Sequence, residues 1–124
     1  MAKILLVEDD ASVRVLAARA LEKAGYSVDT ADDGAAGLDR IHSESGGYDL
    51  VVSDIRMPEM DGIEMAKAAN RRFPGMRIML VTGYADQRER AEELDGIIVD
   101  VVQKPFTLAE IRARVERALH LTCT

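Results

Sequence analysis

LVVSD, residues 50–54, is an apolar run that ends in an acid. It shows no polar alternation, which is the pattern of a strand buried on both faces of a sheet. Similar apolar runs begin at Ile4, Ile78 and Ile97, and a weaker strand is predicted over residues 27–30. Amphipathic stretches separate these runs, so the sequence predicts a strand–helix unit repeated five times.

The stretches between the runs have the spacing of helices with one apolar face. Predicted helices cover residues 13–24, 33–41, 61–73, 86–94 and 107–119. Asp61 with Glu64, and Thr107 with Glu110, have the spacing of capping boxes at helix starts. Strands that alternate with helices predict an α/β fold, in which a parallel sheet carries helices on both faces.

Composition excludes several classes of function. The 22 acidic and 16 basic residues give a formal net charge of −6, which disfavours non-specific binding to nucleic acid. The single cysteine, Cys123, has no partner for an internal disulfide. No apolar run is long enough to cross a bilayer, and the start of the chain does not resemble a signal peptide. We therefore expect a cytoplasmic protein without nucleic-acid or membrane partners.

Polar residues with compatible chemistry follow the apolar runs. Ligands of open α/β sheets bind at the carboxyl ends of the strands, so these residues should lie together. They are Glu8, Asp9 and Asp10 after the first run, Asp54 after the third strand, Thr82 after the fourth and Lys104 after the last. Converging carboxylates favour a hard cation with oxygen ligands, of which Mg²⁺ fits best, whereas a hydroxyl and an ammonium suit phosphoryl oxygens.

Four motifs at these positions resemble those of the receiver domains of two-component response regulators. They are LVEDD at 6–10, SDIRMPEMDG at 53–62, VTG at 81–83 and KPFT at 104–107. The resemblance covers the whole chain in order, which implies one receiver domain over residues 1–124. It also implies a flavodoxin-like, doubly wound (βα)5 fold with a five-stranded parallel sheet in the order 2-1-3-4-5.

The resemblance assigns a role to each site residue. Asp54 would be the phosphoacceptor. Asp9 would bind Mg²⁺ directly and Glu8 largely through water, while Asp54 and the main-chain carbonyl of Arg56 would complete the metal ligands. Thr82 would donate a hydrogen bond to the phosphoryl group and move when it arrives. Lys104 would pair with a phosphoryl oxygen, and the Lys104-Pro105 peptide bond would be cis.

The sequence departs from the family pattern in its last strand. Many receivers carry Tyr or Phe where this chain has Val101, and that ring moves when the threonine does. We therefore hypothesise that Tyr84 takes over the switching role together with Thr82, and repacks against Val101 and the 86–94 helix. Arg56 and Tyr84 are also expected to flank the path along which water attacks the phosphoryl group.

The predicted function is that of a phosphoacceptor switch rather than a turnover enzyme. The phosphodonor would be a histidine kinase or a histidine phosphotransfer protein, and the chain would be a monomer or weak dimer. Candidate downstream targets include a protease complex, because stand-alone receivers of the CpdR-like kind act as proteolysis adaptors. Ala11, Val15 and Ala18 leave the first helix apolar off its core face, which suits a docking partner as well as it suits simple helix formation.

Two alternatives remain open from the sequence. One is a Mg²⁺-dependent phosphatase or phosphotransferase that forms an aspartyl-phosphate. Such enzymes usually carry an Asp-x-Asp nucleophile motif after the first strand, where this chain has Glu8-Asp9-Asp10. The other is that the chain is a receiver fragment of a larger transcription regulator.

Overall fold

The computed structural model describes residues 2–84, 89–91, 94 and 96–120. Its strands are β1 (Lys3–Val7), β2 (Ser27–Ala31), β3 (Leu50–Asp54), β4 (Ile78–Thr82) and β5 (Asp100–Gln103). The helices are α1 (Ala11–Lys23), α2 (Gly34–Ser43), α3 (Gly62–Arg72) and α5 (Leu108–Ala118). Most of the helix predicted at 86–94 lies outside the described residues, as does Cys123.

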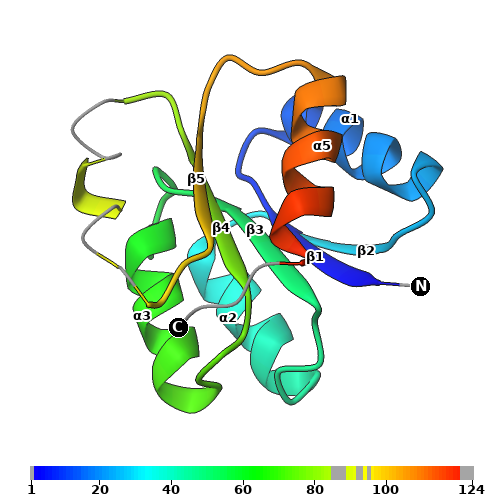
Figure 1. Ribbon diagram of the computed structural model, residues 1–124. Helices are drawn as coiled ribbons and strands as arrows, with labels where there is room; N and C mark the ends of the chain where they lie inside the picture. Colours follow the sequence, from blue (N-terminus) through cyan, green and yellow to red (C-terminus); the bar gives the residue numbers. More distant parts are fainter. Residues whose placement is uncertain (1, 85–88, 92–93, 95, 121–124) are drawn as a thin grey trace.

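The five strands form one parallel sheet in the order β2-β1-β3-β4-β5, as expected. Helices α1 and α5 cover one face of the sheet, and α2 and α3 cover the other (Figure 1). The sheet therefore separates two apolar clusters, one beneath each pair of helices. Because β1, β3 and β4 are buried on both faces, their sequences are continuous apolar runs.

Side-chain caps fix where the helices begin. Both predicted capping boxes are confirmed. The side chains of Asp61 and Thr107 each accept a hydrogen bond from the backbone N–H three residues on, and the carboxylates of Glu64 and Glu110 accept one from the backbone N–H of the cap residue. Asp10 caps α1 by accepting from the N–H groups of the next turn. Each cap satisfies backbone donors that have no partner within the helix.

The loop between β3 and α3 is held by backbone packing that only glycine permits. A Cβ on Gly34, at the start of α2, would lie 2.1 Å from the carbonyl oxygen of Met60. A Cβ on Gly62 would lie 2.3 Å from the carbonyl oxygen of Asp54. The starts of two helices thus press directly on this loop, and the carboxyl end of β3 has a fixed position.

Strand β5 includes the acid that interrupts its apolar run. The Arg114 guanidinium donates two hydrogen bonds of 2.7 Å to the Asp100 carboxylate and one of 3.2 Å to the carbonyl oxygen of Val101. The hydrogen bond and charge of Asp100 raise the pKa of Arg114 above its ordinary value. The paired charge therefore lies at the start of β5 without disrupting it.

The apolar pattern of α1 was only partly predictive. Leu16, which lies at core-like spacing, is 55% exposed, whereas Ala18, expected off the core face, is buried. Val15 is exposed as expected, and Leu108, predicted on the inner face of the last helix, is 46% exposed.

Among the residues in the described ranges, no helix has the length and apolar character to cross a membrane.

Candidate functional site

The predicted site residues meet at the carboxyl edge of the sheet. Parallel pairing places Val7 beside Ser53, Asp54 beside Val81, and Thr82 beside Gln103. The residues that end or follow these strands are therefore neighbours across three strand pairs. Glu8, Asp54, Thr82 and Lys104 come together at this edge, as predicted from the sequence.

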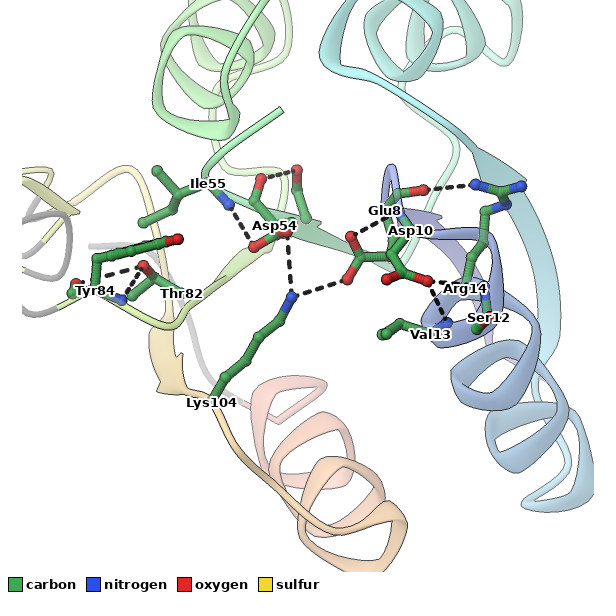
Figure 2. Close-up of polar contacts among 11 residues, drawn as sticks. Glu8, Asp10, Ser12, Val13, Arg14, Asp54, Ile55, Thr82, Tyr84 and Lys104 are labelled. Carbon is green, nitrogen blue, oxygen red and sulfur yellow. Dashed lines mark hydrogen bonds and ion pairs between the residues drawn. The ribbon is translucent and has the colours of Figure 1, made fainter. Parts of the chain in front are cut away.

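Lys104 links the two acids at the centre of the site. Its Nζ lies 3.0 Å from Oε1 of Glu8 and 3.2 Å from Oδ2 of Asp54, and Figure 2 shows the ammonium between the two carboxylates. Partial burial lowers the pKa of Lys104, but the hydrogen bonds and charges of the two acids outweigh this effect and leave the pKa raised. The lysine therefore stays cationic and offsets part of the negative charge.

Glu8 is the most buried acid of the site, with 4% of its surface exposed. Besides Lys104, its carboxylate accepts a hydrogen bond of 3.3 Å from the N–H of Asp10. Its main-chain carbonyl accepts one of 2.8 Å from Nη1 of Arg14, which reaches back from α1 (Figure 2). The sequence did not point to Arg14, because an arginine on an exposed helix gives no signal of a contact with the preceding turn.

Three carboxylates are placed for a metal ion. Glu8, Asp9 and Asp54 each offer one oxygen, and these oxygens lie within 4.8 Å of one another. Partial desolvation, followed by the hydrogen bond and charge of Glu8, raises the pKa of Asp9. A divalent cation bound by oxygen ligands would relieve this repulsion, and Mg²⁺ takes such ligands. The three carboxylates fit the predicted Mg²⁺ ion. The main-chain carbonyl of Arg56 remains a predicted ligand.

The site opens into a polar pocket of about 520 Å³. Its lining consists of Glu8, Asp9, Asp10, Val13, Asp54, Arg56, Gly83, Tyr84 and Lys104. One oxygen of the Asp54 carboxylate accepts a hydrogen bond of 3.1 Å from the N–H of Ile55, which fixes the side chain in its observed orientation. The carboxylate faces a space large enough for a phosphoryl group.

Thr82 ends β4 directly before Gly83 and Tyr84, which line this pocket, and is 1% exposed. Its Oγ1 accepts a hydrogen bond of 3.1 Å from the N–H of Tyr84 (Figure 2). Tyr84 is 49% exposed, and the guanidinium carbon of Arg56 lies 5.0 Å from the centroid of its ring. Val101 is buried in the cluster beneath α2 and α3. The sequence singled out Arg56 and Tyr84 together as flanks of the path of attacking water, but it did not predict their direct contact.

An apolar groove of about 300 Å³ adjoins the polar pocket. It is lined by Val13, Leu16, Ala17, Lys104, Pro105, Phe106 and Leu108. Val13 and Lys104 line both spaces, so the groove is continuous with the mouth of the site. The Lys104-Pro105 peptide bond is cis, as predicted, and lies in the loop that forms one wall.

Comparisons with known proteins agree with this geometry. The family model described as "Response regulator receiver domain" matches residues 4–116. The response regulator receiver protein CpdR of Brucella abortus is 40% identical over 96% of this chain and 98% of its own length. The response regulator MprA of Mycolicibacterium vanbaalenii is 38% identical over 97% of this chain. The match covers 51% of the length of MprA, so this chain spans about half of that relative.

A solved structure carries the same fold with ligands in place. The response regulator protein TrrA of Thermotoga maritima, in complex with Mg²⁺ and BeF, superposes with a TM-score of 0.84. It is 32% identical, and the match covers 95% of this chain and 99% of TrrA.

Repulsion among the acids predicts a trade-off between stability and metal binding. We expect Asp9→Asn to raise the free energy of unfolding in EDTA by about 0.5 kcal/mol, because it removes one of three converging charges. The same change should reduce the extra stability that Mg²⁺ confers on the wild type. Urea unfolding with EDTA and with Mg²⁺ measures both effects.

Asp32→Asn is the matched control, because Asp32 is an exposed acid outside the pocket lining. It should leave the Mg²⁺-dependent stability unchanged. Equal Mg²⁺ effects in wild type and Asp9→Asn would contradict the predicted metal site.

Proposed function

Because the chain belongs to the family of response regulator receiver domains, we propose that Asp54 is the residue that accepts the phosphoryl group. The observation that carries this proposal is the Lys104 ammonium shared between Asp54 and Glu8 at the mouth of a polar pocket. The Asp54 carboxylate lies beside the Lys104 ammonium and near two further acids that could hold a metal ion. This arrangement is suited to take up a phosphoryl group.

The proposed transfer uses each of the clustered groups. One carboxylate oxygen of Asp54 attacks the phosphorus of a phosphohistidine. The bond from phosphorus to the imidazole nitrogen breaks, and its electron pair returns to the imidazole. Lys104 pairs with one phosphoryl oxygen and Thr82 donates a hydrogen bond to another. Both contacts offset negative charge on the phosphoryl oxygens during the transfer.

Receiver domains bind Mg²⁺, and the acids of this chain fit that ion. Glu8, Asp9 and Asp54 would hold it, with the main-chain carbonyl of Arg56 as a further ligand. When bound, the ion supplies positive charge that offsets repulsion between the carboxylates and the phosphoryl oxygens. The position of Glu8 is set beforehand by Lys104 and by the hydrogen bond from Arg14 to its main-chain carbonyl.

Receiver domains are phosphoacceptor switches, and we infer that this chain is not a turnover enzyme. The rival, an aspartyl-phosphate phosphatase, needs a free nucleophile directly after the first strand. Glu8 is instead buried against Lys104, and the Asp10 carboxylate accepts hydrogen bonds from the N–H groups of Ser12 and Val13. Two of the three acids after β1 are therefore engaged, and the third, Asp9, is proposed as a metal ligand, which disfavours the rival.

The groove beside the pocket is the proposed docking surface for the phosphodonor, a histidine kinase or histidine phosphotransfer protein. Leu16 and Leu108 are exposed at its rim, and its wall meets the pocket at Lys104. A helix that carries a phosphohistidine and packs on these leucines would bring its phosphoryl group to Asp54. Apolar surface of this kind is a common feature of protein interfaces.

The remaining assignments stay predictions. They are a single domain over residues 1–124, a monomer or weak dimer, a cytoplasmic location, no nucleic-acid or membrane partner, and a downstream target among which a protease complex is a candidate. The match to nearly the full length of CpdR supports the single-domain proposal. The match to half of MprA is compatible with the alternative that the chain is a receiver fragment of a larger regulator.

Replacement of Leu16 should slow phosphotransfer from protein donors but not from small donors. We expect Leu16→Ser to slow phosphotransfer from a phosphohistidine protein by about 4- to 15-fold. Leu16 is 55% exposed, so a partner would bury about half of the side chain, which corresponds to roughly 0.8–1.6 kcal/mol. Labelling by acetyl phosphate should be unchanged, because a small donor needs no groove. Rates from radiolabelled donors measure both, and equal slowing with both donors would contradict the docking role.

The proposed switch predicts movement of Tyr84. Its ring should become less mobile when a phosphoryl mimic such as beryllium fluoride binds with Mg²⁺, because Thr82 and Tyr84 are joined by a hydrogen bond. Val101 methyl signals should shift with it. Ring and methyl NMR spectra with and without the mimic measure this, and an unchanged ring would contradict the switch role of Tyr84.

The function itself is tested by intact mass after incubation with Mg²⁺ and acetyl phosphate. We expect one added phosphoryl group on the wild type, none on Asp54→Ala and none in EDTA. Asp49→Ala is the matched control, because Asp49 is an exposed aspartate near the opposite end of β3, and it should label normally. A label that persists in Asp54→Ala would overturn the assignment of Asp54.

If acetyl phosphate gives no adduct, the same measurement is made with a phosphorylated histidine phosphotransfer protein. Absence of labelling by both donors would contradict the proposed function. Multiple turnover on a free phosphoester would favour the phosphatase alternative.

A further inference from the structure

The turn between β1 and α1 carries three acids in a row, and Arg14 closes it from the helix side. The turn runs from Glu8 to Asp10. The backbone N–H of Arg14 donates a hydrogen bond of 2.9 Å to the carbonyl oxygen of Asp10. Its Nη1 donates one of 2.8 Å to the carbonyl oxygen of Glu8 (Figure 2). One half-buried residue therefore binds both ends of the acidic turn.

The place of Arg14 in the helix explains this reach. Asp10 is the N-cap of α1, so Arg14 is the fourth helical residue and completes the first turn. Side chains on a helix lean toward its N-terminus, which carries the guanidinium back over the cap. In a hydrophobic staple, the fourth residue packs on the residue before the cap and fixes the angle at which the chain enters the helix. Arg14 makes an equivalent connection with a hydrogen bond, one residue farther back.

This hydrogen bond also constrains Asp9, whose side chain is exposed. The carbonyl of Glu8 and the N–H of Asp9 belong to one rigid peptide plane. Because Arg14 holds the carbonyl oxygen, it fixes the direction in which the chain leaves Glu8, and with it the place of the Asp9 Cα atom. The N–H of Glu8 is held as well, since it donates a hydrogen bond of 3.0 Å to the carbonyl oxygen of Ala31.

We propose that Arg14 is a positioning residue for the metal site and that it favours Mg²⁺ over larger cations. The inference rests on the proposed function, because it takes Glu8, Asp9 and Asp54 as the residues that hold the ion. Mg²⁺ requires near-ideal octahedral geometry with ligands at about 2.0–2.1 Å, whereas Ca²⁺ accepts variable geometry at about 2.3–2.6 Å. A turn held at both ends suits the stricter ion, and a looser turn would still suit Ca²⁺.

The charge of Arg14 and its hydrogen bond have opposite effects on a bound cation. A guanidinium repels a nearby cation, so removal of its charge alone would tighten metal binding. Loss of the hydrogen bond would weaken metal binding, because the turn must then be ordered when the ion binds. Salt screens the effect of the charge, so the effect of the hydrogen bond is best measured at about 0.15 M ionic strength. The sign of the change in affinity therefore shows which effect Arg14 exerts.

The experiment compares the Mg²⁺ and Ca²⁺ dissociation constants of the wild type and Arg14→Met by NMR titration of the backbone amides. Methionine keeps an unbranched apolar stem and is a good helix former, so the fold should persist. Loss of an outer-shell contact costs roughly 10- to 100-fold in metal affinity. We therefore expect Arg14→Met to bind Mg²⁺ about tenfold more weakly, and Ca²⁺ no more than about threefold more weakly.

Arg19→Met is the matched control, because Arg19 is an exposed arginine of the same helix and lies outside the pocket lining. It should bind both ions like the wild type. If Arg14→Met does not fold, Arg14→Lys serves in its place, because lysine keeps the charge but shortens the donor arm. The same directions of change are expected for it.

A second measurement reads the contact without metal. The chemical shift of an amide nitrogen depends on whether the carbonyl of the same peptide plane accepts a hydrogen bond. The Asp9 amide signal in EDTA should therefore move in Arg14→Met and stay in place in Arg19→Met.

Weaker Mg²⁺ binding, a smaller loss for Ca²⁺ and a moved Asp9 signal would support the positioning role of Arg14. Unchanged or tighter Mg²⁺ binding, equal losses for the two ions, or an unmoved Asp9 signal would overturn it. Failure of the wild type to bind Mg²⁺ would instead contradict the metal site of the proposed function.

Discussion

The site depends on electrostatic repulsion between converging carboxylates. Parallel strands bring acids from β1 and β3 to one edge, where Glu8, Asp9 and Asp54 repel one another. Lys104 relieves part of this repulsion by lying between two of them. The pKa of Asp9 is nevertheless raised, first by partial desolvation and then by the hydrogen bond and charge of Glu8. A fold selected for stability alone would not gather these groups, so their convergence is itself an indication of function.

The backbone around the site holds this arrangement in place. Gly34 and Gly62 let two helix starts press on the loop after β3, and caps at Asp10 and Asp61 fix the helices that follow the acids. The result is a rigid platform beneath Asp54. Thr82 and Tyr84 lie on the facing turn, where a glycine and an exposed ring leave room for movement.

The architecture and the central site were largely predictable from the sequence. Buried parallel strands are continuous apolar runs, so an acid, threonine or lysine directly after such a run has a known place in the fold. Exposure on α1 was not predictable, because helical spacing cannot distinguish Leu16 at the rim of a groove from a core leucine. The contacts of Arg14 and Arg56 were also missed, since a long flexible side chain can reach many partners from one position.

Val13 and Lys104 form part of both the apolar groove and the acidic pocket. Any coupling free energy between ligands bound in the two spaces is reciprocal. If occupancy of the pocket alters the affinity of a protein held in the groove, then that protein alters the affinity of the pocket by the same factor. Such a partner would then also be an effector of the site, and its concentration would set how readily the metal and the phosphoryl mimic bind.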